Sequence, residues 1–205
     1  MKKPTVMGGI AIAAVLWFLM FSPWTSGRLG FWPSMTASGL ILAGYAFVAG
    51  QWKHSVRFSF NEAAMGILLA ALLWIVFFVG DKISQCLFPF AKGQVEAIYT
   101  LKDGTNPSLV ALLLLMVIGP AEEIFWRGFV QRGLMEKMGQ WWGWIATTLT
   151  YTLVHIGSLN FMLLMAALVC GAFWGYVYMK WPKRLGAVIV SHALWDAAAF
   201  VVFPF

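Results

Sequence analysis

Seven long apolar stretches constrain this chain more than any other feature of its sequence. They lie at approximately residues 4–21, 31–50, 63–80, 107–134, 141–157, 159–179 and 185–203. Each is near the roughly 20 residues that a helix needs to span the hydrocarbon core of a bilayer. A helix satisfies all its backbone polar groups in that core, where water is absent. The sequence therefore predicts an all-α fold, a polytopic membrane bundle of about seven transmembrane helices.

Composition and charge narrow the class further. Of the 205 residues, 61% are hydrophobic and 11% are charged, which is typical of a polytopic membrane protein rather than a soluble domain. The net charge of +6 does not indicate a nucleic-acid partner, because the lysines and arginines are scattered between apolar runs. With no repeat or second domain visible, residues 1–205 are expected to form a single integral membrane domain surrounded by lipid. Small size and the lack of targeting signals favour a prokaryotic plasma membrane.

The basic residues predict the orientation of the bundle. With the amino terminus inside, nine lysines and arginines fall on the inner side and four on the outer side, so the amino terminus is predicted to be cytoplasmic. The inner set is Lys2, Lys3, Lys53, Arg57, Arg132, Lys137, Lys180, Lys183 and Arg184, and the outer set is Arg28, Lys82, Lys92 and Lys102. Residues 81–106 form the one long connection and are predicted to lie on the outer surface as a cap.

Polar residues mark two expected helix starts. Asn61 and Glu62 are predicted to serve as the cap and first-turn acid of the third helix. Asn160, in a short outer turn, is predicted to cap the helix that follows it.

Ionisable residues are rare inside the apolar stretches. A charged side chain at mid-helix costs roughly 2.5 to 3.5 kcal/mol to insert, so such groups usually face a partner or a wet cavity. The sequence places six there: Glu122, Glu123, Arg127, His155, His192 and Asp196.

The two adjacent glutamates are expected to have different partners. Glu123 and Arg127 have the i, i+4 spacing of a helical ion pair, which is interpreted as structural. Glu122 lies about 100° round the helix from Glu123, so it points elsewhere and is free for a functional role. Gly119 and Pro120 just before them predict a broken helix whose second half begins at Pro120.

Three apolar stretches bring acids and histidines to similar depths. His192 and Asp196 repeat the i, i+4 spacing, as do Tyr151 and His155. At about 1.5 Å per residue, Glu122 and the other groups lie roughly 10 to 21 Å from the cytoplasmic helix ends. We therefore expect one polar cluster inside the bundle.

Three short motifs carry a family resemblance. "EEIFWR" at 122–127 matches EExxxR, "YTLVH" at 151–155 matches an aromatic-xxx-His motif, and "HALWD" at 192–196 matches His-xxx-Asn/Asp. In this order they resemble the motifs of the CPBP family of CAAX proteases and bacteriocin-processing (Abi) enzymes, which includes Rce1-type CAAX endopeptidases. The resemblance covers roughly residues 107–203, whereas residues 1–106, the N-terminal helices and the outer connection, carry no such motif.

The resemblance implies a glutamate-dependent intramembrane endopeptidase. Glu122 and His155 are expected to activate a water that attacks the scissile carbonyl, and His192 and Asp196 are expected to stabilise the oxyanion. The substrate is expected to be a membrane-associated protein or peptide, such as a secreted peptide's leader, a membrane protein, or a lipid-tagged or sorting-tagged chain.

Two residues depart from the family pattern, and three are assigned supporting roles. Tyr151 stands where many relatives have phenylalanine, and it supports the site together with Glu123 and Arg127. Asp196 stands where well-studied CAAX proteases have asparagine, and an ionised carboxylate opposes an oxyanion. Asp196 is therefore either protonated or paired with a charged His192, and the second state is favoured.

Other classes remain as alternatives. Glu122, His155 and His192 together are a ligand set that catalytic zinc accepts, although no HExxH motif is present and no cofactor is expected. A proton- or cation-coupled transporter uses intramembrane acids and histidines, but no inverted repeat is visible. A non-catalytic scaffold with the same fold is the third alternative.

Overall fold

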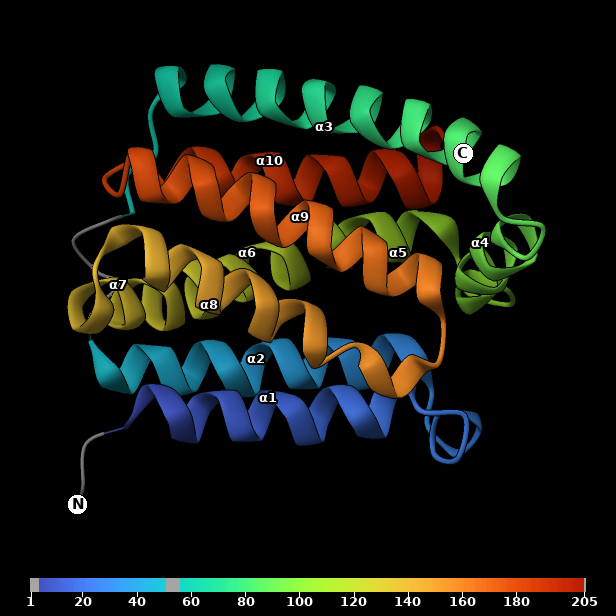
Figure 1. The fold of residues 1–205 in the computed structure, drawn as a ribbon, viewed down its shortest axis with the longest axis horizontal. Helices are drawn as coiled ribbons and strands as arrows, with labels where there is room; N and C mark the ends of the chain where they lie inside the picture. The colour runs from blue at the N-terminus through green and yellow to red at the C-terminus, as the bar shows by residue number, and fades with distance from the viewer. Residues whose placement is uncertain (1–3, 51–55, 205) are drawn as a thin grey trace.

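The computed structural model describes residues 4–50 and 56–204 and is built from helices, with no strand among those residues (Figure 1). The α-helices are α1 (Val6–Phe21), α2 (Phe31–Ala49), α3 (Phe60–Leu87), α4 (Ala91–Tyr99), α5 (Pro107–Leu113), α6 (Gly119–Glu123), α7 (Arg132–Met138), α8 (Gln140–Leu153), α9 (Phe161–Lys180) and α10 (Leu185–Ala197). The π-helical segments are η3 (Leu114–Ile118), η4 (Ile124–Gln131) and η6 (Ala198–Val202). The 3₁₀ segments are η1 (Ser26–Arg28), η2 (Thr100–Lys102) and η5 (Ile156–Ser158). The predicted all-α fold is confirmed.

Each of the seven predicted apolar stretches is helical, and five form helices long and apolar enough to cross a membrane. These are Phe31–Ala49, Phe60–Leu87, Pro107–Met138, Phe161–Lys180 and Leu185–Val202. The other two stretches form the shorter helices α1, with 16 residues, and α8, with 14 residues. The chain is thus an integral membrane helix bundle, while the count of seven spans stays a prediction.

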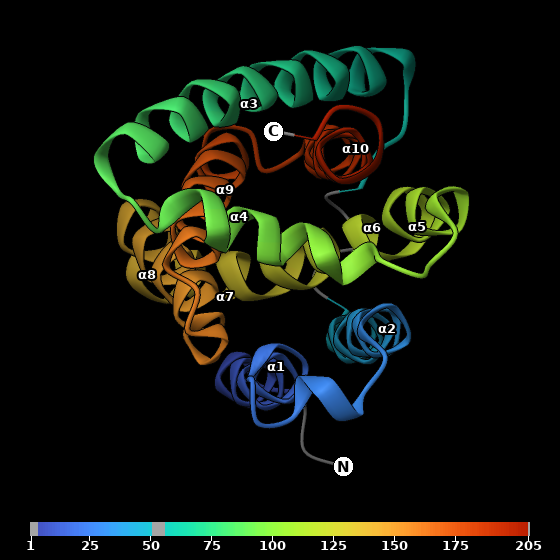
Figure 2. The same cartoon turned by 90° about the vertical axis from the view of Figure 1, so that its right-hand side faces the viewer.

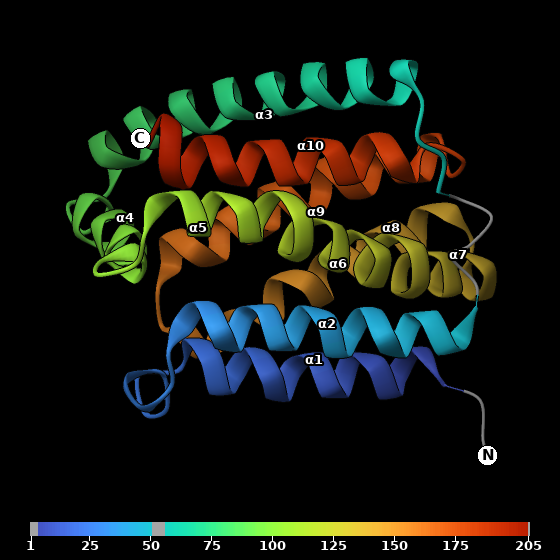
Figure 3. The ribbon, with the colours of Figure 1, turned by 180° about the vertical axis from the view of Figure 1, so that it is seen from behind.

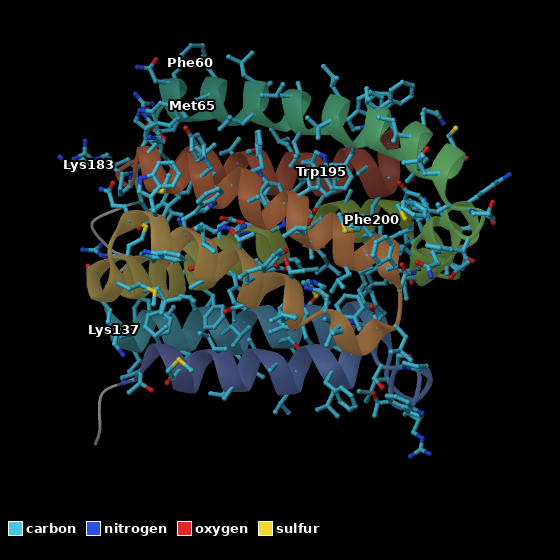
Figure 4. All side chains as sticks on the ribbon, in the orientation of Figure 1. Phe60, Met65, Lys137, Lys183, Trp195 and Phe200 are labelled. Carbon is cyan, nitrogen blue, oxygen red and sulfur yellow. The ribbon has the colours of Figure 1, made fainter. Side chains whose placement is uncertain are left out.

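The basic residues assigned to one side gather at one end of the bundle. Figure 4 shows Lys137 and Lys183 at the end where Phe60 begins α3. Helix α4, which carries Lys92, lies at the opposite end (Figure 1). Lys2, Lys3 and Lys53 lie outside the described residues. The basic residues assigned to the inner and outer sides thus lie at opposite ends of the bundle. Which end is cytoplasmic stays a prediction.

The helical run from α5 to α7 occupies the centre of the bundle. It contacts α10 on one side and α2 on the other, while α3 packs along α10 and α1 along α2 (Figure 3). Helix α8 packs along α9 and also contacts η4 and α7. The run that carries the two glutamates is therefore surrounded by the other motif-bearing helices.

The predicted break at Gly119 and Pro120 is wrong. The chain stays helical from Pro107 to Met138, and the π-helical segment η3 immediately precedes Gly119. Proline cannot donate to the helical hydrogen-bond ladder and its ring clashes with a carbonyl of the preceding turn. The wider π turn accommodates these constraints without ending the helix.

The long outer connection is also more helical than expected. Residues 81–87 extend α3 instead of leaving it, because the first proline after that helix is Pro89. Helix α4 then lies across the end of the bundle (Figure 2). Two hydrogen bonds hold the segment after α4: Trp32 Nε1 donates to the Leu101 carbonyl at 3.0 Å, and Lys102 Nζ to the Phe200 carbonyl at 2.7 Å. This end of the bundle is therefore covered by an ordered helical cap.

The predicted helix starts are correct at Asn160 and Glu62 and wrong at Asn61. The Asn160 side chain accepts a hydrogen bond from the Leu163 amide at 2.9 Å and caps α9 as expected. Helix α3 is capped by Ser59 rather than Asn61. Glu62 is the acid in the first turn of α3, as predicted, and Arg184 and the Ala187 amide at the start of α10 donate to its two oxygens. A buried acid takes the strongest donors nearby, which here lie on another helix.

Candidate active site

Glu123 is the centre of the buried polar cluster. Arg127 Nη1 donates to Glu123 Oε1 at 2.7 Å, so the predicted pair is present, with side chains 1% and 0% exposed. The same oxygen lies 2.6 Å from His192 Nδ1 on α10. Arg127 Nη2 also contacts the Cys170 carbonyl at 3.4 Å. Glu123 therefore joins the first motif to the third, a link that helical spacing alone could not reveal.

Close packing brings those two helices together. A Cβ atom added at Gly119 would lie 2.9 Å from the Cα of Ala193, nearer than real Cβ contacts come. Glycine at this position lets the backbone of α6 approach that of α10 beside His192. The short distance between Glu123 and His192 depends on this approach.

His192 is held between two carboxylates and against an aromatic ring. Its Nε2 lies 3.3 Å from Asp196 Oδ2, while Nδ1 faces Glu123. Its ring stacks on Trp174 with centroids 4.0 Å apart and planes 20° apart. Only a doubly protonated imidazole can donate to both carboxylates when both are ionised. The geometry therefore suits the charged pair favoured above, and a protonated Asp196 fits it as well.

Glu122 points to a different partner, as its position on the helix predicted. The Tyr151 hydroxyl donates to Glu122 Oε2 at 3.1 Å. None of the described residues forms a hydrogen bond to Oε1, and the side chain lines a cavity. Glu122 thus presents one unengaged oxygen where a water or substrate can reach it. Tyr151, predicted to be a supporting residue, contacts the site through its hydroxyl.

Both ring nitrogens of His155 are engaged. Nδ1 lies 2.8 Å from the Tyr151 carbonyl, and Nε2 accepts a hydrogen bond from Trp17 Nε1 at 3.0 Å. Because a carbonyl only accepts, Nδ1 carries the proton and Nε2 carries the lone pair. Trp17 is fully buried on α1, in the part of the chain without a recognised motif. In the sequence it lies only four residues before the end of the apolar stretch 4–21, where tryptophan is common at a membrane interface, so no sequence signal pointed to this contact.

One cavity unites the candidate residues. It has a volume of about 470 Å³, and its lining includes Glu122, Tyr151, His155, His192 and Asp196. Much of its remaining lining is apolar or aromatic and comes from α3, α4, α9 and α10. The predicted polar cluster is therefore assembled, and it lies in the wall of a largely apolar cavity.

The zinc alternative requires several ligands close together, and the described part of the chain does not assemble such a set. No three His, Cys, Asp or Glu side chains there are grouped so as to hold a metal ion. The nitrogens of His155 face Trp17 and a carbonyl, and those of His192 face two carboxylates. These contacts give each histidine a role in hydrogen bonding between helices.

Comparison with known proteins finds one family match, over the part of the chain that carries the motifs. Residues 104–198 match the model of the family described as "Type II CAAX prenyl endopeptidase Rce1-like". The comparisons with curated proteins and with solved structures found no match. The matched region contains all three motifs, and the family is one of peptidases, which supports intramembrane endopeptidase activity in general. The match over residues 104–198 thus supports the assignment of this chain to the CPBP/Rce1-like family.

Proposed function

We propose that this protein cleaves a peptide bond of a membrane-associated substrate with a water activated by Glu122. The observation that carries the proposal is the unengaged Oε1 of Glu122 in the wall of the cavity. A carboxylate in a water-poor site is a strong general base, because little solvent competes for the proton that it takes. The Tyr151 hydroxyl orients Glu122 by binding its other oxygen.

His155 takes part after an exchange of hydrogen bonds. Its protonated Nδ1 is fixed by the Tyr151 carbonyl, so the lone pair on Nε2 is its only acceptor. That lone pair accepts from Trp17. A water or a substrate amide has to replace the indole before His155 can share in proton transfer. In this mechanism Glu122 is the primary base and His155 the secondary group.

His192 supplies the donor for the oxyanion. The short contact with Glu123 and the stacking on Trp174 hold its ring in place, which directs Nε2 towards Asp196. The Nε2 contact, at 3.3 Å, is the longer of the two contacts to carboxylates. The developing oxyanion can accept a hydrogen bond from Nε2 together with Asp196 or in its place, and a preorganised charged donor stabilises such an anion. Asp196 keeps His192 charged until the oxyanion forms.

The cavity favours an apolar substrate within the membrane. Its aromatic and aliphatic walls suit a hydrophobic segment, such as a leader peptide, a sorting tail or a lipid-tagged terminus. The bundle exposes apolar side chains of α3, including Leu68, Leu72 and Ile75, which suits contact with lipid. We place the protein in a prokaryotic plasma membrane, on the grounds of its size and charge pattern.

A substitution in Glu122 tests the proposal. Glu122→Gln keeps the shape of the side chain and an acceptor for Tyr151 but cannot take a proton, so cleavage should be lost while the protein inserts and purifies normally. The control is Glu136→Gln, the same change at an exposed acid on the same helical run. Membrane proteomes of cells producing each form are searched for new peptide ends that depend on Glu122. Full cleavage by Glu122→Gln would refute the assignment.

A further inference from the structure

A buried acid lies at the capped end of the same cavity, away from the three motifs. Asp81 belongs to α3, its side chain is 6% exposed, and it is one of the residues that line the cavity. Its Oδ2 accepts from Gln85 Nε2 at 2.7 Å and from Lys82 Nζ at 3.2 Å. Its Oδ1 is buried without a hydrogen-bond partner. Leaving a buried charged acceptor unsatisfied costs more than leaving a neutral one, so this oxygen favours a further donor.

The charge of Asp81 is only partly compensated by the protein. Lys82 is 60% exposed, and an ion pair with such a solvated partner contributes little. The cavity lining includes the acids Asp81, Glu122 and Asp196 and no lysine or arginine, and the charge of His192 is matched by its contact with Asp196. The amines of Lys82 and Lys102 belong to residues outside the lining, and that of Lys102 donates to the Phe200 carbonyl. The cavity wall is therefore suited to a cation brought by the substrate.

Helix packing fixes the distance of Asp81 from the reacting groups. Helices α3 and α10 run in the same direction, and the rings of Phe77 and Trp195 meet with centroids 4.5 Å apart. If these two rings mark the same level, then at about 1.5 Å per residue Asp81 lies about 4.5 Å beyond the level of Asp196 and about 10.5 Å beyond that of His192. An extended peptide rises about 3.3 Å per residue. A substrate side chain that reaches Asp81 is therefore about one to three residues from the scissile bond.

We propose that Asp81 selects substrates that carry a lysine or arginine about one to three residues from the cleaved bond, within an otherwise apolar segment. This inference rests on the proposed function and names the substrate class for it. The cation donates to Asp81 in place of Lys82 or beside it, and its aliphatic stem lies along the apolar wall. Asp81 acts in substrate selection only and takes no part in the bond-breaking step.

Binding tests the subsite without any chemistry. The catalytically silenced Glu122→Gln protein is placed in lipid nanodiscs and titrated with fluorescent leucine–alanine decapeptides. Each peptide carries one lysine at a chosen position, and its partner carries norleucine, which has the same aliphatic stem without the ammonium group. At the best position, lysine should improve Kd about tenfold over norleucine. In Asp81→Asn, which keeps the side-chain shape, this ratio should fall to about one.

The comparison has an internal control and a clear negative outcome. Glu96→Gln removes an exposed acid on α4 and should keep the tenfold ratio. The ratio of the two Kd values, for lysine and for norleucine, is compared between variants, so the different partitioning of the two peptides into lipid cancels. Equal affinities for lysine and norleucine at every position in the protein with Asp81 intact would overturn the inference.

Cleavage of the same peptides separates the two proposals. With Glu122 intact, kcat/KM should favour the lysine peptides, and Asp81→Lys should transfer the preference to peptides with glutamate. If cleavage depends on Glu122 but is equally fast with and without the lysine, the Asp81 subsite is rejected and the proposed hydrolysis stands. Lysine-dependent binding without any cleavage in the peptide set would keep the subsite and count against the proposed hydrolysis.

Discussion

Glu123→Gln should destabilise the protein by removing the charge that compensates Arg127. The pair has a separation of 2.7 Å and side chains 0% and 1% exposed, so water cannot take the place of the lost carboxylate. Breaking a buried ion pair by changing one partner costs about 3 to 5 kcal/mol. Glutamine still offers an acceptor, and Arg127 keeps its contact with the Cys170 carbonyl. We therefore expect the lower end, about 3 kcal/mol.

Thermal unfolding in detergent measures this loss. For a chain of this size, 1 kcal/mol corresponds to about 2–4 °C in Tm, so Glu123→Gln should lower Tm by about 6–12 °C. The matched control is Glu136→Gln, which breaks the Arg132–Glu136 pair at the same spacing on the same helical run. That pair is 31% and 55% exposed and should cost no more than about 0.5 kcal/mol.

A double variant tests the physical reason for the loss. Adding Arg127→Met to Glu123→Gln removes the uncompensated charge, so the double variant should be more stable than the sum of the two single changes implies. Equal shifts in Tm for Glu123→Gln and Glu136→Gln would refute the explanation by an uncompensated Arg127 charge. Stability losses that simply add in the Glu123→Gln, Arg127→Met double variant would refute it too.

Three further outcomes are expected. Asp196→Asn should stay active but lose activity at a lower alkaline pH than the wild type, because its amide still accepts from His192 and no longer holds the charge of that ring. Asp196→Leu should lose at least about 100-fold in kcat, the scale of losing an oxyanion-site contact. The pH–rate profiles of both variants check this, and an unchanged alkaline limb in Asp196→Asn would contradict the charge-holding role of Asp196. The Trp17→Phe variant should cleave its substrate at or above the wild-type rate, because the change frees Nε2 of His155. It should also lose about 1 kcal/mol of stability, because the buried hydrogen bond is removed. A marked fall in kcat would show instead that the indole positions His155. Exhaustive chelation should leave the activity unchanged. If the protein instead holds stoichiometric zinc, and activity is lost when the zinc is removed and returns when it is added back, the mechanism is metal-dependent.

The individual motifs show how far local geometry can be read from a sequence. Helical spacing correctly paired Glu123 with Arg127 and turned Glu122 towards another partner. Depth along the apolar stretches correctly brought the three motifs into one cluster. The same reading failed at Pro120, because a π turn can absorb a proline that a regular α-helix cannot.

The sequence by itself determined the membrane-spanning class, the helical fold and the residues able to do chemistry. Those properties follow from the length of apolar stretches and from the periodicity of a single helix, which are local quantities. Tertiary structure alone decided that His192 binds Glu123 across 69 residues, that Trp17 binds His155 across 138 residues and that Asp81 lines the same cavity. These contacts depend on how each helix is rotated and shifted against its neighbours, and that is set by the packing of the whole bundle.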